Sequence, residues 1–356
     1  MEPQSEKFLK KLLAAAGPSG FEQEPAQLWR REAETFADRV WGDVSGNSFA
    51  LINPEGAPRV MLAGHIDEIG LMINHIDDDG FLHFSGIGGW DAEVVVGQRV
   101  QIITQHGPLL GVVGKKAIHQ QDKEEQAKAS QIKDLWIDIG AKDGDEARGL
   151  VRVGDPAVLA VELVDLPNRR IAARGLDNRI GAFIVLEALR RLSSQSPAAQ
   201  VVAVATAQEE ISHGVAGGAR PGAFALDPNV AIAVDLTHAT DYPGAEKKGY
   251  GDHRLGSGPV LARGSAVNPE LFERLAAAAE RKKIPYSLEA APRWTSTDAD
   301  SIYTARTGIA TALVSVPNRY MHSPNEMVAL EDLDSAAELI AATVGAFEGD
   351  EDFTRR

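Results

Sequence analysis

Four short, largely apolar stretches of the chain predict buried β-strands. They span Val60–Ala63, Val201–Ala207, Val230–Val234 and Ile309–Val316. Each stretch is continuous rather than alternating between apolar and polar positions, a pattern typical of strands that are covered on both faces. The four stretches therefore predict the buried strands of a parallel or mixed sheet.

Helical spacing of apolar residues lies between several of these stretches. Apolar positions in Asn178–Leu192 fall on one broad face, and Glu270–Lys283 and Asp332–Phe347 carry similar spacing. Near the start of the chain we expect a helix capped by Ser5, a second helix over residues 22–37, and then a β-hairpin. This alternation of strands and helices predicts an α/β fold.

The stretch Gly70–Leu163 has a different pattern. Its apolar runs are short and β-rich, and no amphipathic helix is expected between them. We predict a small β-barrel or sandwich here, inserted into a discontinuous α/β domain of residues 1–69 and 164–356. Within the insertion, Gln120–Gln131 is polar and charged, so we expect a solvated, flexible loop.

The composition narrows the classes of function. The chain has 356 residues, with 36 Lys and Arg against 51 Asp and Glu, which gives a formal net charge of -15. A polyanion would be repelled overall, so we expect neither nucleic acid nor an anionic membrane surface as a partner. There is no cysteine, so any metal must be held by His, Asp and Glu. With no run of about 18 apolar residues and no signal-peptide pattern, we expect a soluble, cytoplasmic protein.

Residues that can ligate metals follow each of the four apolar stretches. In chain order they are His65 with Asp67, Glu209 with Glu210, Asp235, and His322. Ligands of open α/β sheets bind beyond the carboxyl ends of the strands, so we expect these side chains to gather at one edge of the sheet. Asp177, just before the predicted helix, is a further candidate, with a role as helix N-cap as the alternative.

Two metal ions fit this set better than one. A single catalytic zinc needs three protein ligands and a water. Five candidate ligands are present here: His65, Asp177, Glu210, Asp235 and His322. Without thiolates the set suits Zn, Co or Mn, and paired metals indicate a hydrolase. One carboxylate of the Glu209-Glu210 pair would bind metal while the other takes a proton from water, and Asp67 could accept the second N–H of His65.

The motifs that carry these residues resemble those of the M42 metallo-aminopeptidases. In order along the chain they are Gly64–Gly70, Gly175–Arg179, Gln208–Glu210, Val234–Ala239 and Arg319–Pro324. The resemblance implies a zinc-peptidase-like, three-layer α/β/α catalytic domain. It also implies that Asp177 bridges two metals and that Glu209 is the general base. The implied metal sites are His65, Asp177 and Asp235 for one ion, and Asp177, Glu210 and His322 for the other.

The resemblance also implies an assembly and an activity. The inserted β domain would mediate dimerisation and the formation of a hollow homo-oligomer, a dodecamer with tetrahedral arrangement. We expect the enzyme to remove N-terminal residues from peptides. The alternatives are a related amidohydrolase, carboxypeptidase or deacetylase, and a non-catalytic protein that keeps the fold.

One segment and two single residues depart from the pattern of the M42 family. Ile211–Ala219 stands in place of a short glycine-containing turn, Ser296 in place of a Gly, and Ala117 in place of a Pro. His213 lies three residues after Glu210, and both a role at the cleft and a structural role stay open for it. None of these positions is a proposed metal ligand. They leave open which N-terminal residue of a peptide the enzyme prefers, and they do not change the expected reaction.

Overall fold

The central feature of the protein is a mixed sheet of eight strands. The structure, a computed structural model, describes residues 1–212 and 217–355. The order of the strands across the sheet is β1-β2-β12-β3-β13-β16-β14-β15. Their bounds are β1 (Arg39–Gly42), β2 (Ser48–Ile52), β3 (Arg59–His65), β12 (Gln200–Thr206), β13 (Val230–His238), β14 (Val260–Gly264), β15 (Ser287–Ala291) and β16 (Ala310–Asn318).

The four apolar stretches of the sequence form the middle of this sheet. They are β12, β3, β13 and β16, which are adjacent and mutually parallel. Strands β3, β12, β13 and β16 are almost entirely buried. The prediction of parallel strands covered on both faces is therefore confirmed, and so is the antiparallel hairpin of β1 and β2.

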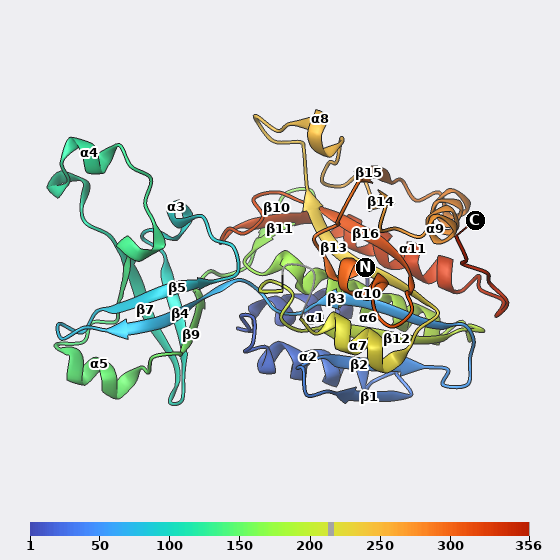
Figure 1. The fold of residues 1–356 in the computed structure, drawn as a ribbon, viewed down its shortest axis with the longest axis horizontal. Helices are drawn as coiled ribbons and strands as arrows, with labels where there is room; N and C mark the ends of the chain where they lie inside the picture. The colour runs from blue at the N-terminus through green and yellow to red at the C-terminus, as the bar shows by residue number, and fades with distance from the viewer. Residues whose placement is uncertain (213–216, 356) are drawn as a thin grey trace.

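Helices cover both faces of the sheet (Figure 1). The larger core cluster includes side chains of α1 (Pro3–Ala14), α2 (Gln23–Ala33), α6 (Leu176–Ser193), α9 (Pro269–Lys282) and α11 (Leu330–Val344). The core on the opposite face includes side chains of α7 (Ala219–Leu226) and α10 (Asp298–Tyr303). A short helix, α8 (Lys247–Tyr250), precedes β14. These layers confirm the predicted α/β fold.

A second unit with its own core projects from this domain (Figure 1). Six strands close into a barrel in the order β4-β5-β8-β7-β6-β9. Their bounds are β4 (Gly70–Ile76), β5 (Leu82–Ile87), β6 (Arg99–Thr104), β7 (Gly107–Gly114), β8 (Trp136–Asp138) and β9 (Pro156–Leu159). Inward-facing side chains such as Leu71, Val100 and Ile137 fill the barrel. The prediction of a small inserted β-barrel is confirmed.

Some helices differ from those that the sequence predicts. The first helix begins at Pro3, and Ser5 is not its cap, because the buried Ser5 hydroxyl donates a hydrogen bond to Glu187 instead. The second helix ends at Ala33 rather than at residue 37. The insertion contains helices that were not expected: α3 (Ala92–Val95), α4 (Lys123–Gln126), α5 (Gly144–Leu150) and the 3-10 turns η1 (Ile118–Gln120) and η2 (Ile132–Asp134).

The segment Gln120–Gln131 is exposed, as expected, but it is not a loop throughout. Asp122 and Glu125 form a capping box that starts the one-turn helix α4. A small sheet of β10 (Val164–Leu166), β11 (Arg170–Ala173) and β17 (Glu326–Ala329) was not expected either. None of the described helices is long and apolar enough to span a lipid bilayer.

Candidate metal centre

The carboxyl ends of the four central strands bring the predicted side chains together. Because these strands are parallel neighbours, their ends meet at one edge of the sheet. The residues there are His65 on β3, Glu209 and Glu210 after β12, Asp235 on β13, His322 after β16, and Asp177 in the first turn of α6. All six lie around one cavity.

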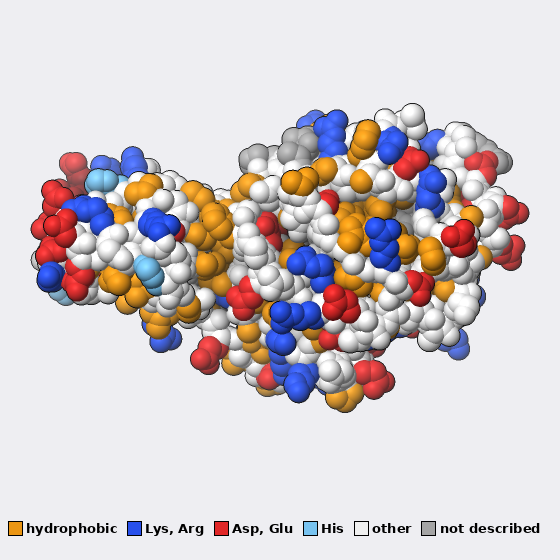
Figure 2. Space-filling view, turned by 90° about the horizontal axis from the view of Figure 1, so that it is seen from below, with side chains coloured by type: hydrophobic (Ala, Val, Ile, Leu, Met, Phe, Trp, Pro, Cys, Tyr) orange, Lys and Arg blue, Asp and Glu red, His pale blue; other side chains and the backbone are white. Residues whose placement is uncertain are grey.

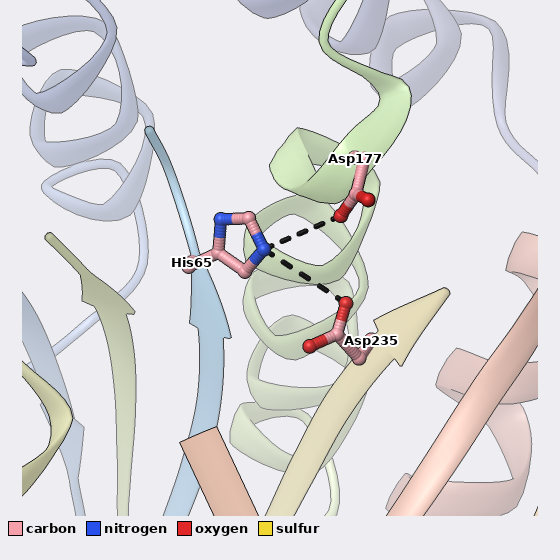
Figure 3. A group of neighbouring side chains, drawn as sticks. All are labelled: His65, Asp177 and Asp235. Atoms are coloured by element: carbon pink, nitrogen blue, oxygen red, sulfur yellow. Dashed lines mark ion pairs between the residues drawn. The ribbon is translucent and has the colours of Figure 1, made fainter. Parts of the chain in front are cut away.

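His65, Asp177 and Asp235 form the first candidate metal group. Nε2 of His65 lies 3.3 Å from Oδ1 of Asp177 and 3.8 Å from Oδ1 of Asp235 (Figure 3). One ligand atom of each residue lies within 4.8 Å of the other two, and all three residues are buried. Two carboxylates and an imidazole at this spacing suit a divalent cation.

Asp177 also belongs to a second candidate group, with Glu210 and His322. Nε2 of His322 lies 3.5 Å from Oδ2 of Asp177 and 3.2 Å from Oε2 of Glu210. The two carboxylate oxygens of Asp177 therefore face different groups. Oε1 of Glu210 is buried and has no hydrogen-bond partner among the described residues. Such an oxygen calls for a ligand such as a cation, so the residues present fit a bound metal.

Asp67 lies behind the first group and contacts its histidine. It is fully buried, and its Oδ1 is 3.3 Å from Nδ1 of His65. Its two oxygens also accept hydrogen bonds from the backbone N–H groups of Glu209 and Glu210, both at 3.1 Å, and from the Ser19 hydroxyl. One carboxylate thus ties the end of β3 to the turn after β12.

Glu209 points toward the first group without being part of either. Its Oε2 lies 3.7 Å from Nε2 of His65, and its side chain is largely buried. Burial raises the pKa of Glu209 to about 10, with His65 opposing this shift and Asp235 reinforcing it. Divalent cations beside it would act in the same direction as His65 and lower that pKa.

The two histidines and Asp177 shift one another's pKa values. Burial acts against protonation of His322, but its hydrogen bonds to Asp177 and Glu210 raise its pKa to about 11. Burial would likewise raise the pKa of Asp177, yet hydrogen bonds from His322 and His65 hold that pKa below its usual value. Cation binding to these groups therefore has to displace protons from the imidazoles.

Two buried acids at this centre were missed by the sequence analysis. Glu326 accepts hydrogen bonds from the backbone N–H of Asp177 at 3.0 Å and of His322 at 2.9 Å. Asp298, at the start of α10, accepts a hydrogen bond from the Thr206 hydroxyl. Glu326 lies four residues after His322 and Asp298 follows Thr297, which caps α10.

The cavity around the centre has a volume of about 580 Å³. Its wall includes the ends of the central strands, β14, β15 and the segment from Pro292 to Thr297 that follows β15, and Gly89 of the inserted unit also lines it. A side chain at Gly89 would come within 3.3 Å of Nδ1 of His322, so the glycine allows the close approach of the insertion. His213, for which a role at the cleft was considered, lies outside the described residues.

Two groups of carboxylate and imidazole side chains share Asp177 and lie at the strand ends of an α/β sheet. This arrangement defines the candidate centre of a metallohydrolase. The chain belongs to the M42 glutamyl aminopeptidase family, whose model matches residues 46–339. The protein is therefore a metallo-aminopeptidase of that family.

Known proteins resemble the chain over nearly its whole length. A lysyl aminopeptidase of Pyrococcus furiosus is 36% identical over 342 residues, which cover 94% of this chain and 95% of that protein. A TET aminopeptidase of the marine sediment archaeon Thaumarchaeota archaeon SCGC AB-539-E09 has a TM-score of 0.91 at 32% identity, over 96% of both chains.

Some of these relatives form large assemblies. The TET1 peptidase of Pyrococcus horikoshii, with a TM-score of 0.84 and 31% identity over 96% of this chain and 100% of that one, can assemble into a tetrahedron or a large octahedral shell. A TET1 structure of equal TM-score is a dodecamer. Oligomers of high symmetry thus occur among the relatives.

Proposed function

We propose that the enzyme uses two divalent cations to hydrolyse the N-terminal peptide bond of peptides. The observation that carries this proposal is the position of Asp177, whose two oxygens face two separate groups of candidate ligands. His65 and Asp235 would complete one site, and Glu210 and His322 the other. The donors are imidazole and carboxylate only, which suits Zn, Co or Mn.

The residues around the two sites have distinct parts in the proposed reaction. Bound divalent cations supply Lewis-acid activation of the attacking water and of the scissile carbonyl. Glu209 accepts the proton of that water and passes it to the departing amine. Asp67 holds the His65 ring in place and fixes the backbone of the Glu209-Glu210 pair through two hydrogen bonds.

The charge of the cavity lining supports recognition of the free amino terminus of a peptide. The cavity lining combines five acidic side chains with three histidines: Asp177, Glu209, Glu210, Asp235, Glu289, His65, His238 and His322. The negative charge of this lining favours a free α-ammonium group over a neutral terminus. An N-acylated peptide lacks this positive charge, so it should be a poor substrate.

The assembly and the domain roles belong to the same proposal. We infer that residues 70–163 form the oligomerisation domain, and that residues 1–69 and 164–356 form the catalytic domain. Hydrophobic side chains are visible on the inserted unit in Figure 2. Those exposed on this unit include Leu110, Val112, Ile118, Leu150 and Val153. Several exposed apolar side chains on one unit support contact with a second copy, within a closed particle built from dimers.

A kinetic panel tests the reaction, the terminus and the metal together. Aminoacyl p-nitroanilides and their N-acetylated forms would be offered to stripped protein after addition of Zn, Co or Mn. We expect no turnover without metal, and turnover only of substrates with a free amine once metal is restored. Release of acetate from the acetylated forms, without release of p-nitroaniline, would indicate a deacylase, and metal uptake with no turnover would indicate a non-catalytic protein. The cytoplasmic location stays a prediction of the sequence.

A further inference from the structure

One wall of the cavity lies beyond the metal groups, on the same face of the sheet. Asp235 on β13 pairs with Ser315 on β16, and Ser315 pairs in turn with Val260 on β14. Two residues further along β14, Ala262 pairs with Glu289 on β15. Paired residues, and residues two apart on one strand, point to the same face of a sheet. Glu289 therefore faces the side on which Asp235 lies.

The carboxylate of Glu289 has no partner within the part of the chain that the structure describes. It is half-buried and lines the cavity, yet it takes part in no hydrogen bond or ion pair there. The lining described for this cavity includes no Lys or Arg. The other four acids of the lining belong to the metal groups or, as Glu209, lie directly beside them. The Glu289 carboxylate thus lacks a cationic partner among the described residues, and a substrate can supply one.

The distance from the metal groups favours a long side chain. Three strand spacings separate β13 from β15, about 14 Å at roughly 4.8 Å per spacing. A group bound at the metals needs an extended chain to reach a carboxylate on β15. Between them, Leu313 and Ala262 offer apolar surface, and the rings of Tyr250 and Trp294 also line the cavity. Such surface suits the methylene stem of Lys or Arg, and aromatic rings attract cations.

We propose that Glu289 is the specificity-determining residue of this enzyme and selects peptides whose first residue is Lys or Arg. This inference rests on the proposed function, since it takes the substrate's first peptide bond to lie at the metal groups. The carboxylate pairs with the ammonium or guanidinium of the first side chain. The same charge repels a first residue of Asp or Glu. The names of the family and of its relatives point to both glutamyl and lysyl substrates, so the charge of the cavity decides between them.

The test compares lysyl and norleucyl p-nitroanilides on the metal-loaded enzyme, because norleucine keeps the apolar stem of Lys and lacks its charge. We expect the wild type to favour Lys in kcat/KM. In Glu289→Gln the ratio of kcat/KM for Lys to that for norleucine should fall about tenfold or more, the scale of a lost hydrogen bond to a charged group. Glu289→Lys should move the preference to glutamyl substrates. Glu273→Gln, an equal charge change at an exposed position outside the cavity, should leave the ratio as in the wild type.

The outcomes separate this inference from the proposed function. Absence of turnover on every substrate by the metal-loaded wild type would refute the proposed function and this inference with it. Turnover without preference for Lys over norleucine, or an equal ratio in wild type and Glu289→Gln at equal metal content, would overturn the role of Glu289 alone. A fall in the ratio in Glu273→Gln as large as in Glu289→Gln would show a long-range charge effect instead.

Discussion

Glu209 and Glu210 are neighbours in sequence but lie in different surroundings. Glu210 contacts His322 at 3.2 Å within the second metal group, whereas Glu209 approaches His65 and belongs to neither group. We expect Glu209→Gln to keep both metals and to lose at least about 10²-fold in kcat, the usual scale of a general base. Glu210→Gln should lose metal. Metal content by elemental analysis and steady-state kinetics check both, and exchanged phenotypes would reverse the two roles.

The sequence could predict most of the centre but not the residues that support it. His65, Glu210, Asp235 and His322 lie at or after the ends of apolar stretches that predict buried parallel strands, so their convergence at one edge of the sheet follows from the pattern. Glu326 could not be found this way. It acts by accepting two backbone N–H groups, of Asp177 and His322, and those donors meet only when β17 and the start of α6 come together.

Asp332 leads to a prediction about pH and stability. It is buried in the first turn of α11, and burial raises its pKa to about 6, although the N–H groups of Gly256 and Gly258 oppose this shift. The folded state then holds this proton more tightly than the unfolded chain does, whose Asp has a pKa near 3.9. Asp332 therefore costs stability as pH rises from about 4 through 6, on the order of 2–3 kcal/mol in total.

The Asp332→Asn variant isolates this effect. Asn cannot ionise, so the wild type should lose stability relative to the variant between pH 4.5 and 7.5. Urea unfolding of both proteins at several pH values measures the difference. The absolute stability of the variant falls as well, because an amide cannot accept from both N–H groups, so only the pH dependence of the difference decides. A constant difference across this range would contradict the assignment.

Arg179 joins three elements through one fully buried guanidinium. From the start of α6 it donates to Glu68 at 2.7 Å, to the carbonyl of Ile66 after β3, and to the carbonyls of Leu12 and Ala15 at the end of α1. It therefore satisfies acceptors that α1 leaves open at its C-terminus.

We expect Arg179→Met to destabilise the fold by about 3–5 kcal/mol, because it leaves buried acceptors and part of the Glu68 charge without a partner. Denaturant unfolding followed by fluorescence measures this loss. Arg31→Met on α2 is the matched control, since Arg31 is exposed, and it should cost under about 0.5 kcal/mol. Equal stability of the two variants would contradict the role assigned to Arg179.

At the level of elements, the pattern of apolar residues predicts the long helices and the central strands but misses short helices. The central strands and α6 carry long buried patterns, and their positions were predicted. Helix α5 has seven residues and buries only Gly144 and Ala147, so no helical period could be read from it. The residue type of Ser5 predicts a helix cap, whereas its hydrogen bond to Glu187 on α6 depends on tertiary contact.

The shape of the whole molecule bears on its assembly. The barrel stands away from the α/β domain (Figure 1) and carries exposed apolar residues, among them Leu110 and Val112 on β7. A tetrahedral particle has twelve equivalent positions, so twelve chains of 38.1 kDa would give about 457 kDa, and an octahedral shell twice that mass. We expect light scattering to find a particle of one of these masses at physiological salt.

The net charge of -15 per chain opposes assembly, and screening over about 8 Å at that salt weakens the repulsion, so the particle should loosen at very low salt.

The double variant Leu110→Asp with Val112→Asp places charge on the apolar surface of β7 and should yield smaller species. Burial of a carboxylate in an apolar contact is costly, whereas the same side chain on a free surface is not. Val44→Asp is the control, because Val44 is fully exposed on the α/β domain, and this variant should keep the wild-type mass. Light scattering over a range of protein concentrations, with kinetics on the same samples, measures both. A wild type that is a monomer near 38.1 kDa at every concentration, with full peptidase activity, would refute an assembly role for residues 70–163.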